Sequence, residues 1–216
     1  MSERAPETLL WDFLRGALTT KALAIVVDLG IPRALADGPR PVAELAGEAD
    51  ADSVHRVLRA LASDGVFAEE EPGVFRHTEA SRLLLGTGWP EFAHLFGGVF
   101  YRNVADLDEA VRTGDPTFQQ AFGTDFWSWL AEHPDERAVF DGAMSGGKER
   151  SAERLAELDW RDGETVVDLG GGNGTLLIEL LRRRPGLRGI VFDLPETDRD
   201  DDTLGPDIEF VEGSFF

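Results

Sequence analysis

The residues best suited to hold a ligand are a run of glycines between two acidic side chains. Asp168 is followed by Gly170, Gly172 and Gly174 in the pattern D-x-G-x-G-x-G, and Asp193 comes 19 residues after Gly174. Glycine lets a backbone turn sharply and come close to a ligand. A carboxylate can accept hydrogen bonds from two adjacent hydroxyl groups of that ligand. These residues therefore form a candidate binding site that consists of a glycine loop without side chains and, after it in the chain, a carboxylate that can accept hydrogen bonds.

The elements around these residues are typical of a βαβ unit. Residues 165–169 form a short, β-branched run that predicts a buried strand, and residues 175–184 predict a helix with a basic C-terminal end. Residues 189–193 predict a second strand. Each strand then ends in an acid, at the edge where open α/β sheets bind ligands.

The glycine spacing favours one cofactor over another. A dinucleotide fingerprint, G-x-G-x-x-G, would need glycine or alanine at the position of Thr175. S-adenosylmethionine has no phosphate and needs only a backbone across which its amino acid and ribose can lie. The sequence therefore predicts S-adenosylmethionine, with Asp193 on the ribose hydroxyls. In the alternative interpretation the glycines serve only a tight turn.

The first 85 residues predict a helical domain with a small hairpin. A helix is expected over residues 8–29, and its segment 22–29 is apolar almost all round, which fits either a subunit interface or an ordinary core helix. Two short helices follow, ended by Gly38 and begun by Pro41, then a third with Asp52 or Ser53 as its N-cap. Two strands are expected around the turn Pro72–Gly73, which completes a winged-helix pattern.

Charge argues against a nucleic-acid role for this winged helix. The hairpin carries Glu69, Glu70 and Glu71, and the chain has a formal net charge of −20. We therefore expect the domain to serve homodimerisation. A winged-helix regulator is the disfavoured alternative.

Residues 86–160 predict helices rich in aromatic side chains. Most of these should form core, but a subset could line a pocket for a flat, aromatic substrate. The substrate candidates are Trp127, Phe140 and Met144.

Composition bounds the remaining function classes. The chain has no cysteine, which excludes thiolate metal sites and cysteine nucleophiles, and we expect no metal. The acidic stretch 196–206 predicts a solvated loop rather than a cation site. No apolar run has the roughly 20 residues of a membrane span, and the N-terminal residues lack the order of a signal peptide, so a cytoplasmic location is expected.

Several motifs together resemble the S-adenosylmethionine-dependent O-methyltransferases of plant phenolics, hydroxyindoles and aromatic polyketide antibiotics. The similarity runs over nearly the whole chain and is carried by IPRALADG, RVLRALASDGVF, FDGAM, VVDLGGGNG, VFDLP and FVEGSFF. The resemblance implies that the cofactor loop includes Asp168, Gly170 and Gly172. It places Asp193 at the ribose, Leu194 at the adenine, and Phe140 and Met144 at the acceptor.

The sequence departs from this family near its end. The family has G-D-[FM]-F after the third strand, and here Gly213, Ser214, Phe215 and Phe216 leave only a hydroxyl for the adenine contact. The family's catalytic histidine follows a later strand, whereas the four histidines of this chain precede the glycine loop. The catalytic base is therefore unassigned. We expect that a second chain supplies the missing strands, or that the protein is truncated or repurposed.

These inferences combine into an α/β fold. A winged-helix-like dimerisation domain is expected over residues 1–110, a helical connector lining the substrate pocket over 111–160, and an incomplete Rossmann-like domain over 161–216. The expected function is O-methyl transfer to a small aromatic acceptor. A non-catalytic ligand-binding or partner-binding member, or one that has drifted to another reaction, is the alternative.

Overall fold

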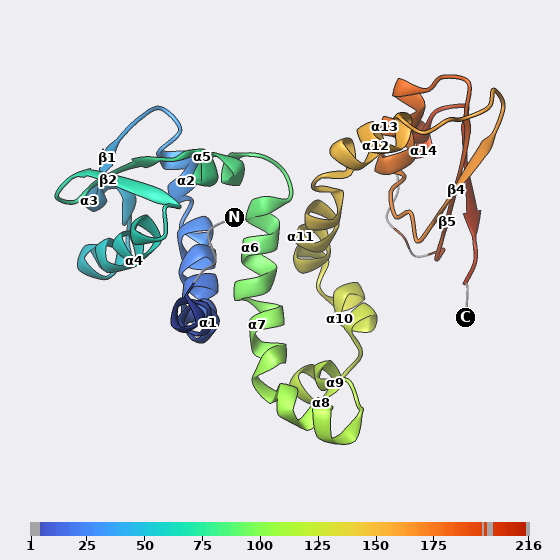
Figure 1. The fold of residues 1–216 in the computed structure, drawn as a ribbon. Coiled ribbons are helices and arrows are strands. Elements are labelled where there is room, and N and C mark those ends of the chain that lie inside the picture. The colour runs from blue at the N-terminus through green and yellow to red at the C-terminus, as the bar shows by residue number, and fades with distance from the viewer. Residues whose placement is uncertain (1–4, 196, 198–200, 215–216) are drawn as a thin grey trace. The chain divides into compact units, whose positions relative to one another are not determined.

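The computed structural model describes residues 5–195, 197 and 201–214, and it divides the chain into two compact units, 1–143 and 144–216 (Figure 1). Each unit contains a three-stranded sheet, with the order β1-β3-β2 in the first and β4-β5-β6 in the second. Within the described ranges, no helix is long and apolar enough to cross a membrane.

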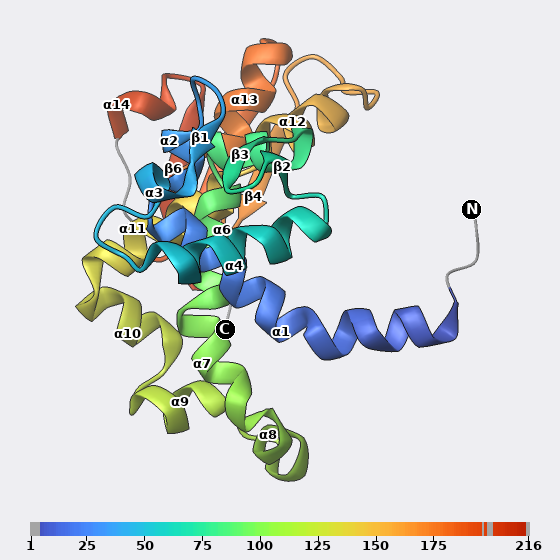
Figure 2. The same ribbon diagram turned by 90° about the vertical axis from the view of Figure 1, so that its left-hand side faces the viewer.

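The first unit begins with the long helix α1, Pro6–Asp28, as the sequence predicts. Its second half is anchored in the core through Ala24 and Val26, which are almost completely buried. Its first half extends away from the rest of the unit (Figure 2). The exposed apolar side chains of α1 lie mostly in this first half rather than in segment 22–29, and they are Leu9, Leu10, Trp11, Phe13, Leu14 and Leu18.

The winged-helix arrangement follows α1. It consists of α2 (Ile31–Ala34), β1 (Arg40–Pro41), α3 (Val42–Leu45), α4 (Ala51–Ser63), β2 (Phe67–Glu71) and β3 (Val74–His77). Leu58, Phe67 and Phe75 are buried in its core. The predicted N-cap of α4 was wrong by two residues or more: Asp50 caps the helix, and its carboxylate accepts a hydrogen bond of 2.9 Å from the Ser53 N–H.

A succession of short helices completes the first unit. They are α5 (Glu79–Arg82), α6 (Trp89–Gly97), α7 (Val99–Asn103), α8 (Leu107–Thr113), α9 (Thr117–Phe122), α10 (Phe126–Glu132) and α11 (Pro134–Ser145), with the 3₁₀ turns η1 (Leu83–Leu85) and η2 (Val104–Asp106). The last two residues of α11 already belong to the second unit. A second core forms here around Leu95, Phe118 and Ala143. The predicted aromatic set is therefore largely core.

The second unit is the predicted βαβ arrangement with one further strand. Helix α12 (Lys148–Ala156) precedes β4 (Thr165–Leu169), α13 (Thr175–Arg183), β5 (Arg188–Asp193), α14 (Asp201–Leu204) and β6 (Ile208–Glu212). All three strands are parallel, and Asp193 pairs in register with Glu212. The acidic stretch 196–206, expected to be a loop, contains the short helix α14, which Leu204 anchors in the core.

One face of this second sheet lacks a covering layer within the described residues. Leu177, Leu180 and Val191 form the core between the helices and the opposite face. On β4, by contrast, Val167 is 50% exposed and Leu169 is 66% exposed. Alternating side chains point to opposite faces of a strand, so these two residues mark the bare face.

Candidate functional site

The glycine loop joins the end of β4 to the start of α13. Gly170, Gly172 and Gly174 have φ angles of 70°, 61° and 76°. This left-handed region costs other residues roughly 1–2 kcal/mol each, so the spacing of the three glycines follows from the path of the backbone. The loop therefore needs these glycines for its conformation.

One side of the loop is tightly packed and the other is open. A Cβ atom on Gly174 would lie 2.4 Å from Leu204 Cδ2, and one on Gly171 would lie 2.9 Å from Asp168 Cγ. A Cβ atom on Gly170 would meet nothing within 4 Å. The open side allows a ligand to approach the bare backbone.

Asp193, at the end of β5, holds the loop from the neighbouring strand. One carboxylate oxygen accepts a hydrogen bond of 2.7 Å from the Gly172 N–H. The other accepts bonds of 2.7 Å from the Leu194 N–H and 3.0 Å from the Thr197 hydroxyl. Because each oxygen has two lone pairs, the first keeps capacity for a further donor. The side chain is half-buried, so a ligand can reach it.

Asp168, at the end of β4, lies beneath the same loop. Burial raises the pKa of Asp168, the positive charge of Lys148 opposes that rise, and the negative charge of Asp193 adds to it. Two carboxylates thus flank the loop, and they favour a cationic group on a ligand.

Lys148, which the sequence analysis did not single out, also reaches the loop. It is the first residue of α12, and its ammonium lies 3.5 Å from the carbonyl oxygen of Gly171. One signal could have drawn attention to it, since this very acidic chain has only one other lysine, Lys21.

The predicted adenine contacts follow β5 and β6. Leu194 is 45% exposed directly after Asp193. The Gly213 N–H donates a 3.0 Å hydrogen bond to the Asp193 carbonyl, which places Ser214 at the same edge of the sheet. Phe215 lies outside the described residues.

The predicted substrate residues are partly brought together. The rings of Trp127 and Phe140 meet edge to face with centroids 5.6 Å apart, and both contact Phe126. Trp127 is 58% exposed, as a pocket wall can be. Met144 follows on the same helix α11 as Phe140 and is 40% exposed.

The four histidines are all engaged in contacts within the first unit. His55 bonds Glu69, His94 bonds Asp28 and Glu136, and His133 bonds the Trp129 carbonyl oxygen. His77 is buried between the Ser81 hydroxyl and the Pro32 carbonyl oxygen. These contacts account for each histidine structurally. The described residues contain no cluster of acids and histidines able to hold a metal ion.

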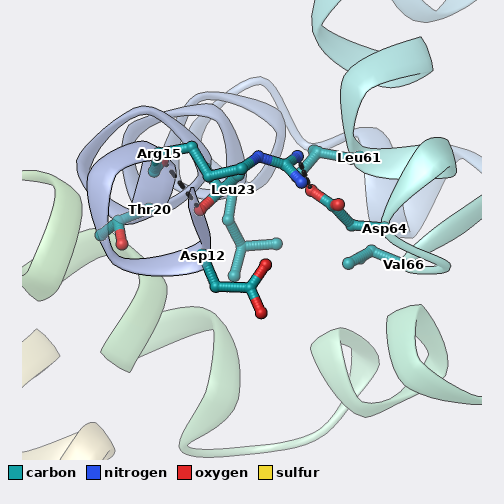
Figure 3. Close-up of a pocket in the computed structure, with 8 residues that line it drawn as sticks. Asp12, Arg15, Thr20, Leu23, Leu61, Asp64 and Val66 are labelled. Carbon is teal, nitrogen blue, oxygen red and sulfur yellow. Dashed lines mark hydrogen bonds and ion pairs between the residues drawn. The ribbon is translucent and has the colours of Figure 1, made fainter. Parts of the chain in front are cut away.

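A separate hollow of about 440 Å³ lies between α1 and α4 in the first unit (Figure 3). Arg15 and Asp64 form a 2.7 Å ion pair across it, with Leu23, Leu61 and Val66 beside them. The Arg15–Asp64 ion pair occupies this hollow, whereas the glycine loop leaves bare backbone open to a ligand, so the loop is the stronger candidate site.

Comparison with known families matches both parts of the chain. Residues 11–87 match the O-methyltransferase dimerisation domain, and residues 104–216 match the O-methyltransferase domain. The phenazine O-methyltransferase PhzM of Lysobacter antibioticus is 38% identical over 195 residues, which are 87% of this chain and 57% of that protein. The O-demethylpuromycin-O-methyltransferase of Streptomyces alboniger is 38% identical over 202 residues, 89% of this chain and 52% of that protein.

Solved structures also match nearly the whole of this chain. LaPhzM superposes with a TM-score of 0.86 at 35% identity, over 98% of this chain and 68% of that one. Human N-acetylserotonin methyltransferase, solved in complex with S-adenosylmethionine, gives a TM-score of 0.81 at 27% identity, over 99% of this chain and 67% of that one. This chain thus spans little more than half the length of the curated relatives it matches.

Proposed function

This chain belongs to the O-methyltransferase family, and from that premise we propose that it forms part of an enzyme that methylates an oxygen of a small aromatic acceptor. One observation carries the proposal: the Gly172 N–H donates a 2.7 Å hydrogen bond to the Asp193 carboxylate. A bare glycine loop and a hydrogen-bonding carboxylate on the next strand therefore share one edge of the sheet.

The residues at this edge fit S-adenosylmethionine. The loop is open at Gly170, where a Cβ would meet nothing within 4 Å, and it can lie against the amino-acid end of the cofactor. Asp193 retains capacity to accept from the ribose hydroxyls. Leu194 and Ser214 adjoin the adenine. S-adenosylmethionine supplies an activated methyl group on a sulfonium. The role of the protein is then to hold the acceptor oxygen in line with that methyl group.

Trp127, Phe140 and Met144 form the acceptor wall of the proposed enzyme. A flat ring can pack against the exposed indole of Trp127 and the ring of Phe140, which already meet edge to face. Aromatic and methionine side chains suit such a ligand because they offer large, adaptable apolar surfaces. The acceptors named for relatives, phenazines and demethylpuromycin, are also aromatic.

The active assembly contains a second copy of this chain and a complementary part that completes the second sheet of each copy. The exposed apolar half of α1 forms the homodimer contact, and most of its exposed apolar residues, from Trp11 onward, lie within the segment that matches the family's dimerisation domain. A complementary part, from a continuation of this chain or from a second chain, adds strands at the free edge of β4 and covers the bare sheet face at Val167 and Leu169. That complementary part carries the catalytic base.

Calorimetry on the 216-residue chain tests the cofactor assignment. S-adenosylhomocysteine should bind more tightly than NAD, and Asp193→Ala should lower its affinity. Tighter binding of NAD, or binding unaffected by Asp193→Ala, would refute the assignment.

Methyl transfer is tested separately by adding labelled S-adenosylmethionine and phenolic acceptors, with and without the complementary strands. We expect turnover only when those strands are present. Cofactor binding without turnover under either condition would favour a non-catalytic member of the family.

A further inference from the structure

The ammonium of Lys148 lies beside the glycine loop at Gly171 and Gly172. It lies 3.5 Å from the Gly171 carbonyl oxygen, and a Cβ on Gly172 would come within 4.0 Å of it. Lys148 is half-buried at the start of α12. The positive charge is therefore held beside the loop rather than extended into solvent.

Most of the donor capacity of Lys148 is unused inside the described chain. An ammonium has three N–H groups, and the long contact to Gly171 is the one hydrogen bond that Lys148 makes with described residues. The nearby Asp168 carboxylate feels this charge, yet it accepts no hydrogen bond from described residues. A cation and an anion thus flank the loop without a direct bond between them.

The other cations of the second unit that have described partners are directed elsewhere. Arg182 and Arg183 pair with Glu179 and Glu149, and Arg161 pairs with Glu164. Arg184 bonds the carbonyl oxygens of Ala156 and Trp160. Lys148 is therefore the cation best placed to meet an anionic group at the loop.

An α-amino acid at neutral pH presents the matching pair of charges. Its carboxylate needs a cationic donor, and its ammonium needs an acceptor a few ångströms away. Charge-assisted hydrogen bonds of this kind are about twice as strong as neutral ones. Lysine and aspartate on either side of a bare backbone meet both needs at once.

We propose that Lys148 binds the carboxylate of the cofactor's amino-acid end, while Asp168 faces its ammonium. This inference rests on the proposed function, because it requires S-adenosylmethionine at the loop. It assigns a specificity role to Lys148: discrimination between ligands that carry the amino-acid carboxylate and ligands that lack it.

The test compares two ligands that differ by that carboxylate alone, S-adenosylhomocysteine and its decarboxylated analogue, by calorimetry on the 216-residue chain. The wild-type chain should bind S-adenosylhomocysteine at least about ten-fold more tightly than the analogue. Lys148→Met should remove most of this preference and leave the affinity for the analogue within about two-fold. Lys148→Arg, which keeps the charge, should retain much of it.

Arg150→Met is the matched control, because it removes one positive charge from an exposed position of the same helix. It should leave the preference unchanged. Equal loss of both ligands in Lys148→Met would overturn the inference, as would an unchanged preference. If Lys148→Met fails to fold, the affinities for the two ligands are compared in Lys148→Gln instead. An unchanged preference in that variant, or no preference in the wild-type chain, would overturn the inference. No binding of either ligand by the wild-type chain would overturn the cofactor assignment and this inference together.

Discussion

Two alanine substitutions in the glycine loop should separate backbone strain from packing. Gly170 and Gly174 have nearly the same backbone conformation, with φ angles of 70° and 76°. Their surroundings differ, because a methyl group on Gly174 would lie 2.4 Å from Leu204 Cδ2 and 3.2 Å from Val191 Cγ2. A methyl group on Gly170 would enter open space.

The expected losses of stability follow from these contacts. Each alanine must adopt the left-handed backbone, at a cost of about 1–2 kcal/mol. At Gly174 the methyl group must also displace Leu204 and Val191, which are both buried, and such overpacking costs about 1–3 kcal/mol more. Gly170→Ala should therefore lower the free energy of unfolding of the second unit by about 1–2 kcal/mol. Gly174→Ala should lower it by about 2–5 kcal/mol.

Hydrogen–deuterium exchange of the peptide containing β5 measures this loss in the second unit alone, with about ten-fold faster exchange for each 1.4 kcal/mol. Ligand binding should rank the variants the other way. Gly170→Ala should weaken S-adenosylhomocysteine binding to the folded protein more than Gly174→Ala does, because its methyl group occupies the open side. Equal destabilisation by both variants, or unimpaired binding by Gly170→Ala, would refute this account of the loop.

Three further predictions concern the first unit. Burial alone would lower the pKa of His94, but its contacts with Asp28 and Glu136 outweigh burial and raise the pKa. Protonated His94 therefore stabilises the folded unit fully below the ordinary pKa of histidine, and this stabilisation is lost as pH rises through the raised pKa. In His94→Gln, thermal unfolding should accordingly show a smaller stability difference between pH 6 and pH 8 than in the wild-type chain. Gly97→Ala, whose methyl group would lie 2.2 Å from Ala24 Cβ, should destabilise the unit by about 1–3 kcal/mol in urea unfolding, whereas Gly16→Ala on α1, which meets nothing within 4 Å, should stabilise it by up to about 1 kcal/mol. Replacing the exposed Phe13 and Leu14 by serine should shift the proposed homodimer toward monomer in light scattering without loss of helix signal. An unchanged dimer would place the interface elsewhere.

Periodicity and glycine spacing predicted most of the fold. The βαβ unit was predictable because its strands, glycine turn and helix each carry a local signal, and the strands at 165–169 and 188–193 are close to the expected positions. The N-cap of α4 was not, because Asp50, Asp52 and Ser53 are all good capping residues and the direction of chain entry decides among them. Helix α14 was missed because its acidic sequence argues for a loop, whereas Leu204 holds it against the core.

The candidate site was predictable in the residues that turn the chain and much less so in those that reach it from elsewhere. Asp168, Gly170, Gly172 and Asp193 stand in one motif, so their spacing alone brings them to one sheet edge. Lys148 comes from a helix that begins 20 residues before the motif, and only the packing of α12 beside the loop gives it a place there. Short-range patterns carry no information about such an approach.

The structure also indicates which residue reports most cleanly on ligand binding. The Asp193 carboxylate accepts hydrogen bonds from Gly172, Leu194 and Thr197, so its replacement by alanine should loosen the loop as well as remove the proposed ribose contact. A loss of affinity in Asp193→Ala therefore combines two effects. Lys148 has one long hydrogen bond within the described chain, and its removal leaves the bonds between Asp193 and the loop in place. A ligand-selective loss in Lys148→Met would thus report a direct contact, because a loosened loop would weaken both ligands alike.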